Sequence, residues 1–335
     1  YLMKSMDEGK AYAKRALEAA SSIKQRYEVY LLNMKFFEAY SRYDENTEEG
    51  LCALKALGAP LGKADDDMEL TQIIDLEYEK FRNAISDGLE GFMAKDNVPS
   101  EVKRYEMVIL VNMCTSAHRS NQDLYALILL RLGNLMFQHG SIDSAPFALI
   151  HLGSLLCYRY GAYAKGMELG DLGLKMLDAT LSHKFYTRTL SVYQISMSHF
   201  RETFKVLEKE LDEGTEYCIE RGDAQGANNL MYAKIRNQLL SGVEVKGFLR
   251  LCDESLDTLG INSHKGFTAQ VCLLKTIGLM LGGYNSKLYA QNKKKAILYM
   301  EECNCQASLA SYHVLVGWVD CLRGNYEKAD QYYKK

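Results

Sequence analysis

The sequence is poor in proline and lacks a long uncharged apolar run. It has three prolines in 335 residues, far below the usual frequency of roughly 5%. Because proline interrupts helix interiors, its scarcity favours a nearly all-helical chain. The longest apolar stretches, which are interrupted by Arg131 and Lys275, read "LYALILLRLGNLMF" and "VCLLKTIGLMLGG". Both are shorter than the roughly 20 residues that a membrane-spanning helix needs, so we expect no membrane insertion.

The sequence also lacks an excess of charge of either sign. It carries 40 Lys and Arg against 43 Asp and Glu, a formal net charge of −3. Such a balance gives no general attraction to nucleic acid or to anionic membranes, and we expect no nucleic-acid partner. The nine cysteines are odd in number and are scattered mainly through apolar stretches, unlike a secreted disulfide framework. We therefore expect a reducing, cytoplasmic location.

Motifs for catalysis or nucleotide binding are missing. The nearest approach to G-x4-G-K-[ST] is "GAPLGKA" at 58–64, which is one residue short and lacks the magnesium-binding hydroxyl. No G-x-G-x-x-G follows a strand, and neither D-F-G nor H-R-D occurs, so the kinase catalytic motifs are missing. We expect this chain not to be an enzyme, with no catalytic residues, no cofactor and no bound metal.

Helix breaks instead recur at a regular interval. The steps 140–161, 222–242 and 242–260 between glycines span 21, 20 and 18 residues. Between the breaks, apolar residues follow the helical period. Two examples are Phe204, Leu207, Leu211, Gly214, Cys218 and Tyr163, Met167, Gly170, Leu174, Leu177. Short turns between such helices make neighbours antiparallel. The pattern predicts an all-α, α–α superhelix, a tetratricopeptide-like solenoid of about eight helical hairpins.

We interpret residues 1–335 as a single solenoid domain that is least regular at 62–100 and 283–306. Its ends, "EGKAYAKRALEAA" and "GNYEKADQYYKK", read as amphipathic helices without polar capping repeats. We therefore expect the chain to be a fragment from the middle of a longer protein. Small residues within the helices predict places where two helices cross closely; the alternative is a local kink. The small residues are Ser154, Gly166, Gly170, Gly173, Gly317 and Ala329.

Several residue groups suggest chemistry but have simpler explanations. Cys303, Cys305 and His313 offer three metal ligands, yet a fourth ligand is missing and ordinary thiols explain them better. The acidic run at 65–67 suits a helix N-terminus, and the lysines at 293–295 suit a solvated helix face. His199, in "SHFRET", has the threonine but not the acidic neighbour of a phospho-acceptor histidine, and we interpret it as structural.

One helix offers candidate peptide contacts. The stretch "GANNLMYAKIRNQ" is predicted to be the first helix of its hairpin, a position that commonly lines the concave face of a tetratricopeptide superhelix. Asparagine and basic side chains there suit an acidic peptide. The candidate contacts are Asn228, Asn229, Lys234 and Arg236. The alternative is exposed polar helix surface.

Three blocks of the chain resemble a known family. They are "SRYDENTEEGLCALKALGAPL" (41–61), "LYALILLRLGNLMFQHGSIDSAPFALIHLGSLLCYRYGAYAKGMELGDLGLKML" (124–177) and residues 185–254, which begin "FYTRTLSVYQISMSHFRETFKVLEKE". They resemble the tetratricopeptide-like helical-repeat region of large predicted-ATPase, multi-sensor signalling kinases. In these, kinase-like and STAND-type, AAA-like ATPase domains precede the repeats, and a GAF domain with a histidine kinase or cyclase follows. Asn46 departs from the pattern, as does the polar, basic stretch 283–306.

The resemblance implies a non-catalytic helical-repeat scaffold or sensor region of a large ATPase-linked signalling protein. Such a region would bind protein or peptide partners and neighbouring domains of the same polypeptide, and it would transmit the signal to them. The alternative is a stand-alone tetratricopeptide adaptor that binds acidic peptides. A third reading, an enzyme built on a helical solenoid, needs clustered ligands or paired carboxylates, which the sequence does not offer.

Overall fold

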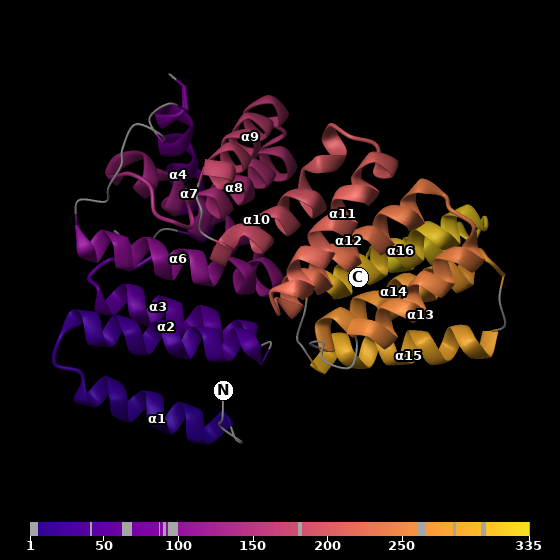
Figure 1. Cartoon of the computed structure of the whole chain (residues 1–335), viewed down its shortest axis with the longest axis horizontal. Helices are drawn as coiled ribbons and strands as arrows, with labels where there is room; N and C mark the ends of the chain where they lie inside the picture. Colours follow the sequence, from indigo (N-terminus) through magenta and orange to yellow (C-terminus); the bar gives the residue numbers. More distant parts are fainter. Residues whose placement is uncertain are drawn as a thin grey trace. The chain divides into compact units, whose positions relative to one another are not determined.

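The computed structural model describes residues 6–40, 42–61, 69–86, 88–89, 92, 100–179, 183–259, 265–283, 286–302 and 306–334. These residues form sixteen α-helices and one 3-10 turn, and no strand occurs among them. The predicted all-α fold of packed helix pairs is confirmed (Figure 1). The chain divides into two compact units, Tyr1–Phe185 and Tyr186–Lys335. One continuous solenoid over 1–335 stays a prediction.

Unit 1 contains eight described helices, and α10 begins at its end. Their bounds are α1 (Met6–Ala19), α2 (Ile23–Ala39), α3 (Tyr43–Ala56), α4 (Leu70–Ala84), α6 (Glu101–Ser120), α7 (Gln122–His139), α8 (Ala145–Tyr160) and α9 (Tyr163–Ala179). The pairs α2–α3, α6–α7 and α8–α9 pack as hairpins, and α6 packs on both α2 and α3. The core of the unit lies on α6, α7 and α8, where Met107, Leu129 and Leu152 are fully buried.

Short polar side chains and glycine set the helix ends. Ser22 precedes α2 and its hydroxyl accepts a hydrogen bond from the backbone N–H of Gln25 at 3.2 Å. Asn121 does the same for Leu124 at the start of α7, at 2.9 Å. These side chains satisfy N–H groups that have no partner within the helix. Gly161 ends α8 with φ 63°, a left-handed conformation that glycine adopts without strain.

The predicted close crossing occurs between α8 and α9. A Cβ on Gly166 would lie 2.6 Å from the backbone oxygen of Gly153, and one on Gly173 would lie 3.0 Å from that of Pro146. Glycine therefore allows the two backbones to approach each other more closely than any other residue would. The predicted buried stripe of α9 is only partly right. Leu177 and Gly170 are buried, but Tyr163 is exposed and the contact face includes Gly166 and Gly173 instead.

Two departures from a regular pattern are visible in unit 1. Asn46 replaces the small residue expected in α3, yet it is 1% exposed and its Nδ2 donates to the Met34 backbone oxygen of α2 at 2.7 Å. Helix α4 lies within the irregular stretch 62–100, and it packs on α7. Helix α3 packs directly on α6, which follows α4 in the sequence. Residues 65–67 lie outside the described part.

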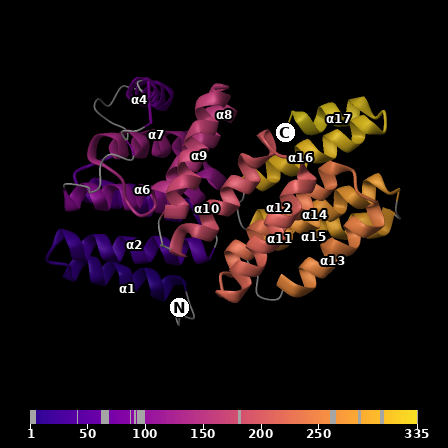
Figure 2. The same ribbon diagram turned by 45° about the horizontal axis from the view of Figure 1, so that its top comes forward.

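Unit 2 contains most of α10 and the remaining helices. Their bounds are α10 (His183–Ser196), the 3-10 turn η1 (Ser198–Phe200), α11 (Phe204–Glu220), α12 (Ala224–Ser241), α13 (Val245–Leu259), α14 (Lys265–Leu281), α15 (Ser286–Glu302), α16 (Gln306–Leu322) and α17 (Tyr326–Tyr333). The pairs α11–α12, α14–α15 and α16–α17 pack closely, and α12, α14 and α16 contact one another in succession. Figure 2 shows α16 beside α17.

The core of unit 2 follows the predicted stripes. Leu207, Leu211 and Cys218 of α11 are buried against Leu230 of α12, which confirms the apolar face expected for this helix. Trp318 is half-buried against a second cluster around Tyr312 and Val316. None of the described helices is both long enough and apolar enough to span a membrane.

Candidate functional site

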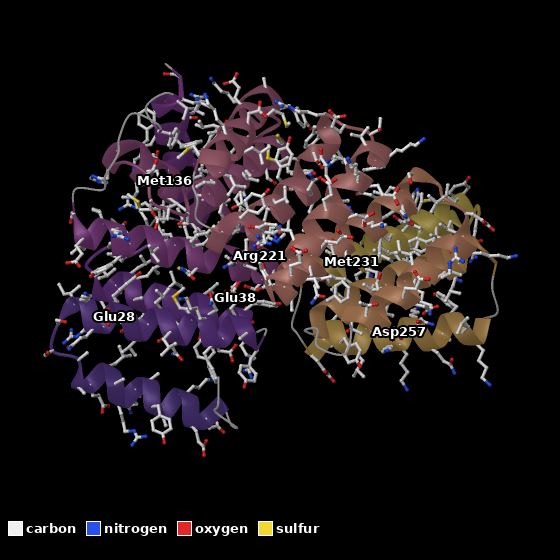
Figure 3. The ribbon with its side chains drawn as sticks, in the orientation of Figure 1. Glu28, Glu38, Met136, Arg221, Met231 and Asp257 are labelled. Atoms are coloured by element: carbon white, nitrogen blue, oxygen red, sulfur yellow. The ribbon has the colours of Figure 1, made fainter. Side chains whose placement is uncertain are left out.

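The candidate peptide contacts lie on α12 in unit 2, and the start of this helix is fixed by Asp223. The Asp223 carboxylate accepts a hydrogen bond from the Gly226 N–H at 2.9 Å and another from the hydroxyl of Thr187 on α10. The helix ends at Gly242, which has φ 75°. Helix α12 packs on α11, α13 and α14, so most of its sides face other helices. In Figure 3, Met231 marks this helix.

The structure separates the four predicted residues. Asn228 is buried, with 4% of its surface exposed, and its Oδ1 has no hydrogen-bond partner among the described residues. Lys234 is already engaged, because its Nζ lies 2.6 Å from Oδ1 of Asp212 on α11. Asn229 and Arg236 are half-buried and lie seven residues apart, which places them on one side of the helix about two turns apart. The four residues therefore do not form one contact surface.

Arg236 contacts a residue that the sequence pattern did not single out. Its Nη2 donates a hydrogen bond to Oδ1 of the adjacent Asn237 at 3.2 Å. Asn237 is 3% exposed, and its Nδ2 is buried without an acceptor among the described residues. The buried Nε of Arg236 also has no acceptor there. Sequence spacing gave no signal for Asn237, because successive residues on a helix point about 100° apart.

His199 of η1 lies in the electrostatic field of Arg236. Burial is the main cause that lowers the pKa of His199 below its ordinary value, and the positive charge of Arg236 lowers it further. The imidazole ring also lies 4.3 Å from the ring of Phe200, measured between centroids. The lowered pKa favours the uncharged form of His199 beside Arg236. That His199 is structural stays a prediction.

Three acidic groups of α11 already have partners. Asp212 pairs with Lys234, and Glu208 accepts from Nε2 of Gln238 at 2.8 Å. Glu210 accepts from Nε2 of Gln194 on α10 at 2.6 Å. Among the described residues, no carboxylate lies within salt-bridge distance of Arg236. This is unusual, because charges that are removed from water are normally paired.

A second candidate site is an apolar groove between α1 and α2 in unit 1. It has a volume of about 310 Å³. Its walls carry residues at helical spacing on both helices, and its polar side chains are few. Tyr12, Leu32 and Tyr40 are among the most exposed large apolar residues of the unit. The lining residues are Gly9, Tyr12, Ala13, Ala16, Val29, Leu32, Asn33, Lys35, Phe36, Ala39 and Tyr40.

A buried ionic group in unit 1 is structural in character. Glu77 of α4 and Glu106 of α6 are buried, and Arg131 of α7 contacts both. Lys80 and Lys103 pair with the same carboxylates at 2.9 and 2.6 Å. Asn134 donates to Glu77 at 2.7 Å. Each carboxylate thus has more than one donor, and the group joins three helices.

The remaining sequence candidates do not assemble into a metal or phosphate site within the described residues. Cys303 and Cys305 lie outside the described part, and within it no three His, Cys, Asp or Glu side chains are placed to hold a metal. Lys293 packs against aromatic rings, with its Nζ 5.8 Å from the centroid of Tyr289 and 5.9 Å from that of Tyr312. No protein family, curated protein or solved structure matches this chain.

Proposed function

We propose that this chain is a non-catalytic helical-repeat scaffold and sensor region of a large ATPase-linked signalling protein. The resemblance of residues 41–61, 124–177 and 185–254 to such regions supports the ATPase-linked context. The free thiols Cys114, Cys157 and Cys252 are buried in helices, which supports a reducing, cytoplasmic setting.

The observation that carries the protein-binding part of the proposal is the apolar groove between α1 and α2. Contiguous apolar surface that is exposed on a folded chain commonly marks an interaction site. Leu32 is 67% exposed in this groove although it stands two residues before Met34, which is fully buried. An amphipathic helix of a partner or of a neighbouring domain of the same polypeptide suits such a groove, because apolar residues at helical spacing match its two walls.

The contacts between successive helix pairs support the signal-transmission part of the proposal. Each helix pair contacts mainly its neighbours, so a partner that binds one pair changes the packing of the next. Small displacements summed over several pairs then alter the position of domains attached to the array. In this proposal, binding biases the activity of an ATPase or output domain elsewhere in the polypeptide.

The test combines flanking sequence with an enzymatic assay. The coding region read outward from this chain is expected to encode a P-loop ATPase before the repeats. The purified chain is expected not to hydrolyse ATP. ATP turnover by the purified chain that is abolished by a point substitution within it would contradict the proposal.

A second candidate function is a stand-alone adaptor that binds acidic peptides. The specific observation in its favour is Arg236, a half-buried cation without a carboxylate partner among the described residues. This function would be favoured over the first if a natural start codon lay directly before Tyr1 and the same reading frame encoded no ATPase domain.

A further inference from the structure

The feature that carries a further inference is a pair of buried hydrogen-bond donors on α12. The Nε of Arg236 and the Nδ2 of Asn237 are both buried and lack an acceptor among the described residues. They belong to side chains that touch each other, since Arg236 Nη2 lies 3.2 Å from Asn237 Oδ1. Asn237 is 3% exposed, so water has little access to its amide. Leaving such donors unsatisfied costs free energy.

Charge balance adds a second, independent observation. Three acidic residues of α11 are already engaged. Gln238 contacts Glu208, Gln194 contacts Glu210, and Lys234 pairs with Asp212. Arg236 is half-buried and keeps its positive charge without a counter-ion among the described residues. An acceptor that also carries negative charge would satisfy both deficits at once.

We propose that Arg236 and Asn237 form a binding site for one carboxylate group, supplied by an acidic side chain or a chain terminus of a protein partner. A carboxylate is acceptor-only when ionised and takes two donors on its two oxygens. The guanidinium supplies further N–H groups in a planar fork that matches this shape. Arg236 is only partly buried as a residue, so part of it is open to solution.

A single carboxylate suits the site better than a phosphate. The lowered pKa of His199 favours its uncharged form, and Lys234 is paired with Asp212. The single positive charge of Arg236 balances one carboxylate but leaves a doubly charged phosphate partly uncompensated in a half-buried position. The inference rests on the protein-binding part of the proposed function, and it specifies the chemistry that the partner presents.

The test is a titration of the full chain, labelled with ¹⁵N-arginine, in which the Arg236 Nε signal is followed by NMR. The probes are N-acetyl-alanine for a chain terminus, N-acetyl-glutamate N-methylamide for a side chain, and inorganic phosphate. Sodium chloride keeps ionic strength constant throughout. We expect a saturable shift with at least one carboxylate probe, and a dissociation constant on the order of 1–10 mM, as two charge-assisted hydrogen bonds give.

Variants of the chain then assign the effect to this site. Arg236→Gln should abolish binding of the carboxylate probe, as should Asn237→Asp, because the new carboxylate lies beside the guanidinium and replaces the ligand. In these variants binding is followed from the probe's own NMR signals. Arg250→Gln is the matched control: Arg250 is 77% exposed on α13, and binding should stay within twofold. Circular dichroism confirms that each variant is folded.

The wild-type titration decides the matter even if a variant fails to fold. Saturable binding of a carboxylate at least tenfold tighter than phosphate supports the inference, and the tighter carboxylate probe identifies the source. The inference is overturned if phosphate binds as tightly as either carboxylate, or if chloride alone reproduces the Nε shift. It is also overturned if no shift occurs at 100 mM probe, roughly ten times the weakest dissociation constant expected. None of these results depends on whether an ATPase domain flanks the chain, so the proposed function is tested separately.

Discussion

The guanidinium of Arg131 holds the buried carboxylate of Glu106, with Nη2 3.3 Å from Oε1. Its Nη1 also lies 3.8 Å from Oε1 of Glu77, so one side chain of α7 bridges α4 and α6. Glu106 is 1% exposed. Arg131, which interrupts the apolar stretch of α7, therefore pairs with two carboxylates that are buried in the core of unit 1.

Removing this bridge is expected to destabilise unit 1 strongly. Arg131→Met leaves Glu77 and Glu106 with fewer donors while filling similar volume, and we expect the free energy of unfolding to fall by about 3 kcal/mol. Chemical denaturation followed by circular dichroism measures this. Arg159→Met is the control, because Arg159 pairs with Asp123 at a more exposed position, and a loss of only about 0.5 kcal/mol is expected. Equal losses in the two variants would contradict the role of Arg131.

The close approach of α8 and α9 predicts an unfavourable response to alanine at Gly166. Its Cβ would lie 2.5 Å from Sγ of Cys157 and 2.6 Å from the Gly153 backbone oxygen. We expect Gly166→Ala to lose about 2 kcal/mol of stability through overpacking, although alanine is the better helix former. A Cβ on Gly247 of α13 would have no described atom within 4 Å, so Gly247→Ala should gain about 0.5 kcal/mol. Thermal unfolding of both variants tests the difference in sign.

The depressed pKa of His199 predicts that acid destabilises unit 2. Burial chiefly, and Arg236 in addition, lower the pKa of the folded state below the unfolded value near 6.5. The unfolded chain therefore binds more protons as pH falls below about 6.5, and the free energy of unfolding decreases over that interval. His199→Gln should make the difference between pH 7.5 and pH 5.5 smaller. An unchanged pH dependence in this variant would show that other groups cause it.

Buried thiols should react far more slowly than an exposed one. Burial raises the pKa of Cys218 to about 12, and Asp223 contributes in the same direction; burial likewise raises the pKa of Cys252 to about 12. Because the thiolate is the nucleophile, we expect alkylation of both at pH 8 to be more than about 100-fold slower than that of the exposed Cys52. Peptide mass spectrometry after timed iodoacetamide treatment gives the rates. Comparable rates at Cys52 and Cys252 would refute the buried assignment.

The helical class was predictable because the signal is local. Apolar spacing and glycine breaks are properties of neighbouring residues, and they correctly indicated the buried face of α11 and the crossing at Gly166. The face of α9 was predicted only in part, because Gly166 and Gly173 count as weakly apolar in a pattern while their missing side chains decide where α8 packs.

The polar candidates show where sequence reasoning ends. Lys234 is predicted as a peptide contact, yet it pairs with Asp212, 22 residues earlier, and no helical period relates the two. Arg236 was selected for its charge, whereas its contact with Asn237 and its proximity to His199 depend on how α12 and η1 pack. Pairing between elements is thus the information that the linear pattern did not contain.

Helix α4 imposes an order on the folding of unit 1. The hydrogen bond from Asn134 to Glu77 spans 57 residues, whereas helix hairpins such as α8–α9 join segments that are adjacent in sequence. Contacts between distant segments form late, since a long loop must close first. During synthesis α4 has no α7 to pack on until about residue 139 has been made, so its apolar face, which includes Ile74 and Phe81, stays uncovered while α2 and α3 are already able to pair. The nascent chain is therefore most vulnerable to aggregation and proteolysis between these two events.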